Sequence, residues 1–190
     1  MTVTYKTIGA TVLLAAVMIP ASLRGQAAPE VFTATAAVKG AGGAAASAPV
    51  TITIDRKMSQ KEADSLAAAF KTGGAAALRK GLAGVAPTGT VKIGAGKATP
   101  TRFTLERATA DGRLLTMLTD QPLLFIGAGV PGAKPKAGYD FAVIDIEVDG
   151  KGSGSGTIAP AAKIKMNQGA FVVEDYGAEL VRLTAVKKTK

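Results

Sequence analysis

The sequence of 190 residues contains no cysteine and no histidine. Without thiols the chain can form no disulfide bond, no thiol nucleophile and no lipid-modified cysteine. Without imidazole it can form neither a Ser-His-Asp triad nor a histidine zinc site. Any metal would need oxygen ligands, which favours calcium or magnesium, and acid–base chemistry would depend on Asp, Glu, Lys or Tyr. Tryptophan is absent and aromatic residues make up 5%, so we expect no nucleic-acid partner.

The N-terminus has the three-part pattern of a secretory signal peptide. Lys6 precedes an apolar run over residues 8–19, and the small residues Gly25 and Ala27 occupy the two positions that a signal peptidase checks. The pattern predicts cleavage after Ala27, so that residues 1–27 are removed and the protein is periplasmic or extracellular. The alternative is an uncleaved N-terminal anchor, because Arg24 interrupts the cleavage region. Contact with a membrane is otherwise expected only during export.

Cleavage would leave residues 28–190, a length typical of one domain that buries roughly two-thirds of its unfolded surface. Two of the 23 basic residues leave with the signal peptide, so 21 basic residues face 14 acidic ones and the net charge becomes +7. Three of these charges lie in the basic tail, residues 187–190. The tail could contact an anion, a nucleic acid or a membrane surface, but its terminal position favours a frayed, solvated end.

Most of the mature chain has the pattern of short strands. Residues 49–55, PVTITID, alternate strictly, with Val50, Ile52 and Ile54 on one side. Asp111-Gly112 suits the two-residue turn of a hairpin. Further strands are expected over residues 30–39, 88–96, 101–110, 113–120, 139–148, 157–166, 170–176 and 179–188, with a short apolar run over 122–127 and a loop over 128–138.

A helical hairpin is predicted over residues 59–84. Ser59 and Glu62 have the spacing of a capping box, in which each side chain accepts from the other residue's backbone N–H. Apolar residues then recur at helical spacing, at positions 63, 66, 67 and 70. Gly73-Gly74 interrupts the pattern before a second short helix.

The links between consecutive strands are short, which requires antiparallel pairing because a parallel crossover needs roughly a dozen residues. Only the helical hairpin is long enough to serve as such a crossover. We therefore expect a mainly β single domain, an antiparallel β-barrel or β-sandwich, with the helical hairpin against one face or end of the sheet. The sequence does not distinguish the barrel from the sandwich.

The segment 148–158, VDGKGSGSGTI, follows an expected strand and raises the question of a phosphate-binding loop. Glycine occupies every second position from 150 to 156, which does not match a dinucleotide fingerprint, and Lys151 is not followed by the Ser or Thr of a P-loop. Phosphate loops also lead into a helix, whereas the following TIAP predicts a strand. We predict a hairpin tip with an Asp149-Gly150 turn and no cofactor. Its glycines either make the tip flexible or allow a ligand or another chain to lie close.

Asp145, Glu147 and Asp149 alternate along an expected strand and would lie on one face, each roughly 7 Å from the next. They could ligate calcium near the turn, or two of them could form a hydrolytic carboxylate pair. The remaining interpretation is a solvated face opposite an apolar one, which is the default for a half-buried strand. The apolar face would consist of Ala142, Ile144, Ile146 and Val148.

A second polar group ends another expected strand, in the segment EDY. Glu174 and Asp175 could pair there with Arg182 or Lys165, next to Tyr176. Ordinary polarity at a strand end accounts for the same residues.

Six segments occur in an order that resembles a family of exported bacterial proteins without an assigned function: PVTITIDR, GGAAALRKGL, LLTMLTDQPLLF, YDFAVIDIEVDGKGSGSG, AAKI and EDYGAELVRL. The resemblance covers most of the mature chain and implies export and a single domain. That family has an arginine where Gln121 stands, and a Trp-Glu pair near Phe125 and Ile126. Both features are missing here, and any binding that they perform in the family would be missing too. The resemblance implies no catalytic residue.

Three functions remain compatible with the sequence. The first is a non-enzymatic, β-rich exported domain that binds a small apolar ligand or an envelope protein. The second is a hydrolase that uses two of the carboxylates Asp145, Glu147, Glu174 and Asp175. The third is an oxygen-ligated calcium site around Asp149. The absence of a convergent catalytic set favours the first.

Overall fold

Ten strands and one helix make up the part of the chain that the structure, a computed structural model, describes: residues 28–39, 45–123, 137–167, 170–177 and 180–190. The strands are β1 (Glu30–Lys39), β2 (Ala45–Ile54), β3 (Gly89–Ile93), β4 (Thr99–Thr101), β5 (Phe103–Ala108), β6 (Gly112–Leu118), β7 (Phe141–Asp149), β8 (Ser153–Asn167), β9 (Ala170–Tyr176) and β10 (Val181–Lys188). The signal-peptide prediction, most of the run over 122–127 and nearly all of the loop over 128–138 lie outside the described residues.

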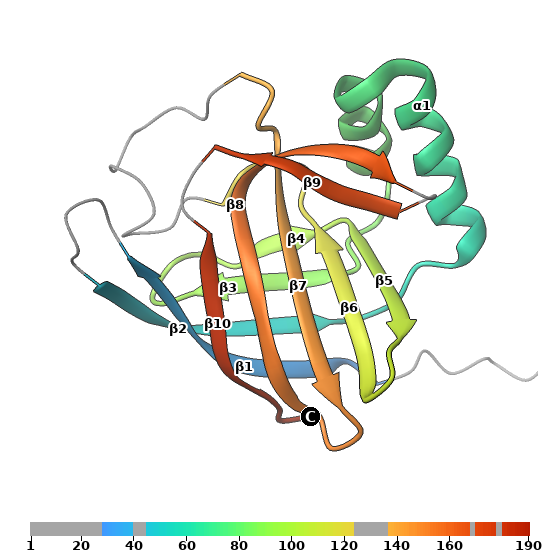
Figure 1. The fold of residues 1–190 in the computed structure, drawn as a ribbon. Coiled ribbons are helices and arrows are strands. Elements are labelled where there is room, and N and C mark those ends of the chain that lie inside the picture. Colours follow the sequence, from blue (N-terminus) through green and yellow to red (C-terminus); the bar gives the residue numbers. More distant parts are fainter. Residues whose placement is uncertain (1–27, 40–44, 124–136, 168–169, 178–179) are drawn as a thin grey trace, which may run out of the picture.

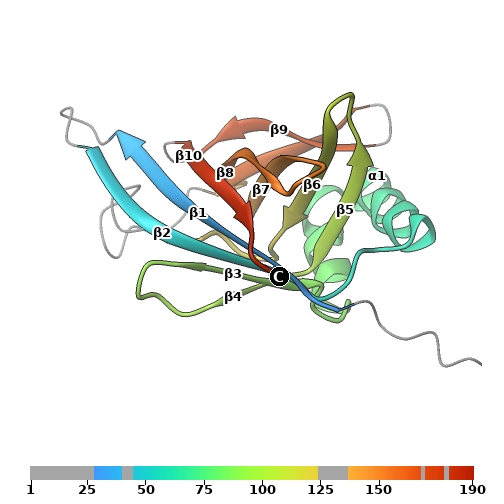
Figure 2. The same ribbon diagram turned by 90° about the horizontal axis from the view of Figure 1, so that it is seen from below.

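All strand pairs are antiparallel, as predicted, and they form one sheet in the order β4-β3-β2-β1-β10-β8-β7-β6-β5, with β9 paired to β8. The two ends of this path, β4 and β5, are separated in sequence by Arg102 alone, so the sheet returns to its starting point. Figure 2 shows the sheet curled over on itself, with β1–β4 in one wall and β5–β8 in the other. The fold is therefore a nearly closed, barrel-like single domain rather than an open sandwich.

Buried threonine hydroxyls link the two ends of the sheet. Thr104 on β5 donates to the hydroxyl of Thr88 at 2.8 Å, and the Thr88 hydroxyl lies 3.2 Å from the carbonyl of Thr101 on β4. All three threonines are fully buried. The backbone N–H of Met58 also donates to the Thr104 carbonyl at 2.9 Å. These bonds satisfy polar groups that an open sheet would leave unpaired at its edges.

Two apolar cores lie on opposite faces of this sheet. The inner core collects the inward side chains of both walls, among them Phe32, Ile52, Met117, Ile144 and Leu183, each 0–1% exposed. Because strand side chains alternate between faces, the neighbouring outward residues of β5–β8 form a second core, among them Phe103, Leu118, Phe141, Val143 and Ala159. This outer core needs a cover, which the helix and β9 supply.

The helix α1 (Gln60–Ala83) begins with the predicted capping box. The Ser59 hydroxyl accepts from the Glu62 N–H at 3.3 Å, and the Glu62 carboxylate accepts from the Ser59 N–H at 2.8 Å. Gly73 and Gly74 leave helical geometry, with φ of 62° at Gly74, and divide α1 into the two predicted segments. Figure 1 shows α1 at one side of the barrel, next to β9. Four buried residues face the outer core: Ala63, Leu66, Leu78 and Leu82.

The predicted hairpin tip is confirmed for residues 150–152, which lie between β7 and β8, whereas Gly154 and Gly156 belong to β8 and pair with β7. The Asp149 carboxylate accepts the N–H groups of Lys151 at 2.8 Å and Ser153 at 2.9 Å, which fixes the turn. A Cβ placed on Gly154 would lie 1.8 Å from the carbonyl oxygen of Glu147. The bare glycine position thus lets the neighbouring strand of the same sheet lie close.

The C-terminal tail is ordered by pairing, so the prediction of a frayed end is wrong, whereas residues 187–190 are solvent-exposed as predicted. Lys187 and Lys188 belong to β10, and Lys188 Nζ lies 3.0 Å from Glu30. Beyond the strand, the N–H of Thr189 donates to the Val31 carbonyl at 2.8 Å, and the carbonyl of residue 190 accepts from the Val31 N–H at 3.1 Å. The start of β1 supplies these partners, which composition and position could not reveal.

No helix in the described ranges is long and apolar enough to cross a membrane.

Gly154→Ala is expected to destabilise the protein, because the new Cβ would collide with backbone of β7 that cannot swing aside as a side chain could. We expect a loss of about 2 kcal/mol, which lowers the Tm by roughly 4–8 °C in a domain of this size. Gly150→Ala is the matched control, since its Cβ would meet nothing within 4 Å. Thermal unfolding followed by circular dichroism measures both, and equal Tm values for the two variants would contradict the close approach.

Candidate functional site

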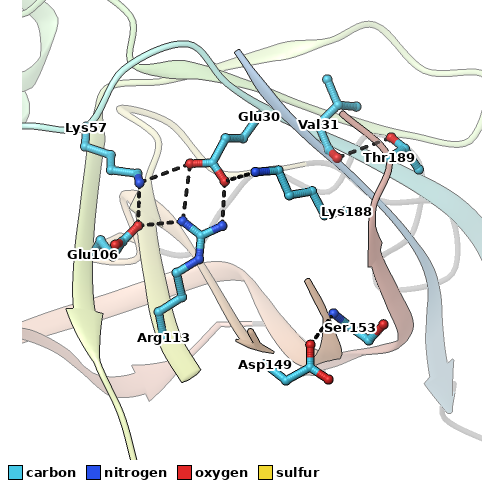
Figure 3. Close-up of polar contacts among 9 residues, drawn as sticks. All are labelled: Glu30, Val31, Lys57, Glu106, Arg113, Asp149, Ser153, Lys188 and Thr189. Carbon is cyan, nitrogen blue, oxygen red and sulfur yellow. Dashed lines mark hydrogen bonds and ion pairs between the residues drawn. The ribbon is translucent and has the colours of Figure 1, made fainter. Parts of the chain in front are cut away.

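The largest cluster of charges in the described chain lies at one end of the barrel (Figure 3). Glu30 at the start of β1 contacts three cations: Arg113 at 2.5 Å, Lys57 at 3.0 Å and Lys188 at 3.0 Å. Glu106 on β5 contacts two of them, Lys57 at 2.5 Å and Arg113 at 2.8 Å. The cluster therefore joins β1 and β10 to β5 and β6, which belong to different parts of the barrel wall.

This network is a structural brace. The Arg113 guanidinium, with Lys57 and Lys188, lowers the pKa of Glu30 to about 2 although partial burial opposes the shift. Partners likewise lower the pKa of Glu106 against desolvation. Each cation is engaged by a carboxylate, so the network offers no free acid, base or anion-binding group. Its position holds the start of β1 next to the end of β10.

Glu30→Gln should destabilise the protein at neutral pH by about 2–3 kcal/mol, because the carboxylate that three cations share is lost. The folded-state pKa lies below the ordinary value of 4.5. The wild type therefore has the full contribution above about pH 5 and loses it as the pH falls toward 2. The difference between the two proteins should shrink over that window.

Urea unfolding between pH 3 and pH 7 measures this difference. Glu147→Gln, which alters an exposed carboxylate on β7, is the control and should leave stability unchanged. A constant difference between Glu30→Gln and wild type across the pH range would contradict the brace.

A small cavity opens on the outside of the barrel, where the first turns of α1 and the start of β9 meet β5 and β6. We call it the notch, and its volume is about 40 Å³. Figure 1 shows these four elements meeting at one side of the sheet. The notch is lined by Gln60, Ala63 and Asp64 from α1, Phe103, Leu105 and Arg107 from β5, Thr116 from β6 and Phe171 from β9.

The floor of the notch is apolar and rigid. Phe103 and Phe171 pack edge to face with ring centroids 5.6 Å apart, and Phe171 contacts Phe70 of α1 in the same way at 5.7 Å. Edge-to-face geometry is favourable for aromatic rings and fixes their orientation. Phe103 is 3% exposed, so the rings are held by the outer core on the side away from the notch.

The rim of the notch is polar. On α1, the Gln60 amide donates to the Asp64 carboxylate at 2.8 Å. On the sheet, Arg107 follows Phe103 and Leu105 on the same face of β5, because side chains two residues apart point the same way. An apolar floor with a few polar groups at the edge is the usual composition of a binding site.

Asp145 lies immediately behind the notch. The Thr116 hydroxyl, which lines the notch, donates to the Asp145 carboxylate at 2.6 Å. Desolvation by burial raises the pKa of Asp145, while the Thr116 hydrogen bond and the charge of Arg107 oppose the shift. The expectation of a fully solvated carboxylate face is therefore wrong for Asp145. α1 and β9 cover this end of the outer face.

The three carboxylates predicted on β7 do not come together in one group. Glu147 is exposed, and one oxygen of Asp149 already accepts the two N–H groups of its turn. In the ranges that the structure describes, no group of three or more Asp or Glu side chains lies close enough to hold a metal ion. The geometry gives the calcium hypothesis no support.

The carboxylates on β9 are engaged separately. Glu174 pairs with Lys163 on β8 at 3.1 Å, a cross-strand partner other than the predicted Arg182 or Lys165. Asp175 accepts a hydrogen bond from the Tyr139 hydroxyl at 2.5 Å, and this contact raises the pKa of Tyr139. Neither carboxylate lines the notch.

Sequence reasoning missed the residues that line the notch. Gln60, Arg107 and Phe171 come from three distant segments, each of which is unremarkable by itself. One signal was present on β5, where Phe103, Leu105 and Arg107 alternate with other residues. That pattern places an arginine beside an apolar surface, but it does not reveal which elements complete the cavity.

Comparisons with protein-family models, curated proteins and solved structures find no match to this chain. The geometry of the notch therefore supplies the basis for a functional proposal.

Proposed function

We propose that this protein is an exported, non-enzymatic domain that binds a partner protein by accepting one of its side chains in the notch. The observation that carries the proposal is the composition of the notch: an aromatic floor of Phe103 and Phe171 beside a rim that includes Arg107 and Asp64. An envelope protein is the expected class of partner for an exported chain.

The size of the notch favours a side chain over a whole small molecule. Sites for small ligands usually enclose about 300–1,000 Å³, whereas the notch has about 40 Å³. The inward side chains of the barrel, such as Phe32, Met117 and Ile144, are fully buried against one another in the inner core. A protein partner therefore agrees better with the geometry than a small apolar ligand does.

The arrangement of the acidic residues argues against a carboxylate-dependent hydrolase. Such an enzyme needs two carboxylates that converge on a cleft with different pKa values. Of the four acids considered, only Asp145 adjoins the notch, while Glu147 is exposed and Glu174 and Asp175 are engaged on β9. Binding without catalysis requires no such pair.

Leu105→Ala should weaken partner binding about tenfold, because Leu105 supplies apolar contact in the notch and each buried methylene group contributes about 0.8 kcal/mol. Leu114→Ala is the matched control: Leu114 is half-buried on the adjacent strand, opposite Arg107 in the sheet register, and it does not line the notch. The probe is a displayed library of random peptides selected on the wild-type protein.

The affinities of the selected peptides are then measured by fluorescence polarisation. Peptides that lose affinity on Leu105→Ala and keep it on Leu114→Ala support the proposal. A library that yields no peptide with this dependence overturns it.

Export is tested independently of binding. The N-terminal pattern supports cleavage after Ala27, so intact-mass spectrometry of the protein expressed with its full sequence should find a chain that begins at Ala28. Fractionation should place this species outside the cytoplasm. A recovered protein that retains Met1 would refute cleavage and favour the uncleaved anchor.

A further inference from the structure

We infer that the notch recognises the C-terminal residue of the partner polypeptide, with an apolar side chain on the aromatic floor and the terminal carboxylate on Arg107. This inference rests on the proposed function, because it names the chemical group that the notch accepts. Most polar groups around the notch already have a hydrogen-bond partner, and the remaining ones determine what a ligand can contact.

Arg107 is the exposed cation of the notch. It makes no hydrogen bond or ion pair with any residue that the structure describes, and its charge acts on Asp145 at longer range. The nearby acids are engaged, since Asp64 accepts from the Gln60 amide and Asp145 accepts from the Thr116 hydroxyl. A guanidinium presents paired donors that match a carboxylate in two parallel hydrogen bonds. The open position at the rim therefore suits an anion.

The floor next to Arg107 suits an apolar group instead. Phe103, Phe171 and Ala63 offer no polar partner on the floor, and burying a charge against them would be costly. An internal Asp or Glu carries its carboxylate on its side chain. If that side chain entered the notch, it would bring a charge to the apolar floor and no apolar group to cover it. The last residue of a chain carries an apolar side chain and a carboxylate on the same Cα, so it can satisfy the floor and Arg107 together.

The small volume sets the size of that side chain. About 40 Å³ is a few times the roughly 10–15 Å³ of cavity that one water needs. This space is sufficient for the methyl groups of alanine or valine, with a larger side chain reaching out over Leu105. The net charge of the chain after cleavage, +7 from 21 basic and 14 acidic residues, also favours the approach of an anion over that of a cation.

Two synthetic peptide pools test this inference. Both consist of fluorescein-labelled hexapeptides randomised at the first five positions and ended by Ala, Val or Leu, one pool with a free C-terminal carboxylate and the other with a C-terminal amide. We expect the free acids to bind the wild-type protein about tenfold or more tightly than the amides, as is usual for a charged hydrogen bond.

Variants of the protein test whether the tighter binding of the free acids arises at the notch. Arg107→Gln should remove the advantage of the free acids, and Arg182→Gln should keep it. Arg182 is an exposed arginine on β10 that makes no hydrogen bond or ion pair with the described residues and does not line the notch. Asp145→Asn should keep or strengthen acid binding, because it removes a neighbouring negative charge.

The outcomes separate this inference from the proposed function. Amides that bind as tightly as acids, with affinity still dependent on Leu105, would overturn C-terminal recognition and leave partner binding intact. Binding that tightens on Arg107→Gln and weakens on Asp145→Asn would overturn it in favour of a cationic side chain. Absence of any Leu105-dependent binding in either pool, together with an unproductive random library, would overturn both.

Discussion

The rest of the structure depends on one carboxylate, that of Glu30, which holds three cations from distant parts of the chain. Arg113 comes from β6, Lys57 from the segment before α1 and Lys188 from β10. The first strand is thereby tied to the last strand and to the opposite wall. In a sheet whose ends could otherwise separate, this brace keeps one end of the barrel narrow while the buried threonines join its edges.

Closure of the barrel creates the outer core, and the outer core creates the notch. Once the inward side chains of β5–β8 fill the interior, their outward neighbours must be covered by α1 and β9. The apolar surface that α1 and β9 cover ends at two places. On α1 the first turn presents the polar residues Gln60 and Asp64, and on β5 Leu105 is followed on the same face by Arg107. Apolar floor and charged rim meet at that boundary. Asp145 is left half-covered there, which accounts for its raised pKa.

Much of the fold could be predicted from local patterns. The alternation in residues 49–55 and the capping box at Ser59 depend on neighbours in sequence, and the structure contains both. The first hairpin was predicted, but its turn is at Ala110-Asp111 and not at Asp111-Gly112, because Thr109 pairs with Gly112 and Gly112 is already in β6. β4 was missed because it has three residues and contains a proline. The ordered C-terminus was missed because its partner, Val31, lies at the other end of the chain. Local periodicity carries no information about such pairings.

By itself the sequence determined the class of the protein: strands from strict alternation, a broken helix from Gly73-Gly74, and the exclusion of thiol and imidazole chemistry from composition. Only the tertiary structure decided between barrel and sandwich, because that choice depends on whether β4 and β5 meet. Only the tertiary structure also shows that charged residues with similar neighbours in sequence have different roles. Glu30 became part of a brace and Asp149 fixed a turn, whereas Arg107 stayed exposed beside an aromatic floor without a hydrogen bond or ion pair to the described residues, because contacts between distant segments determine which polar groups find partners.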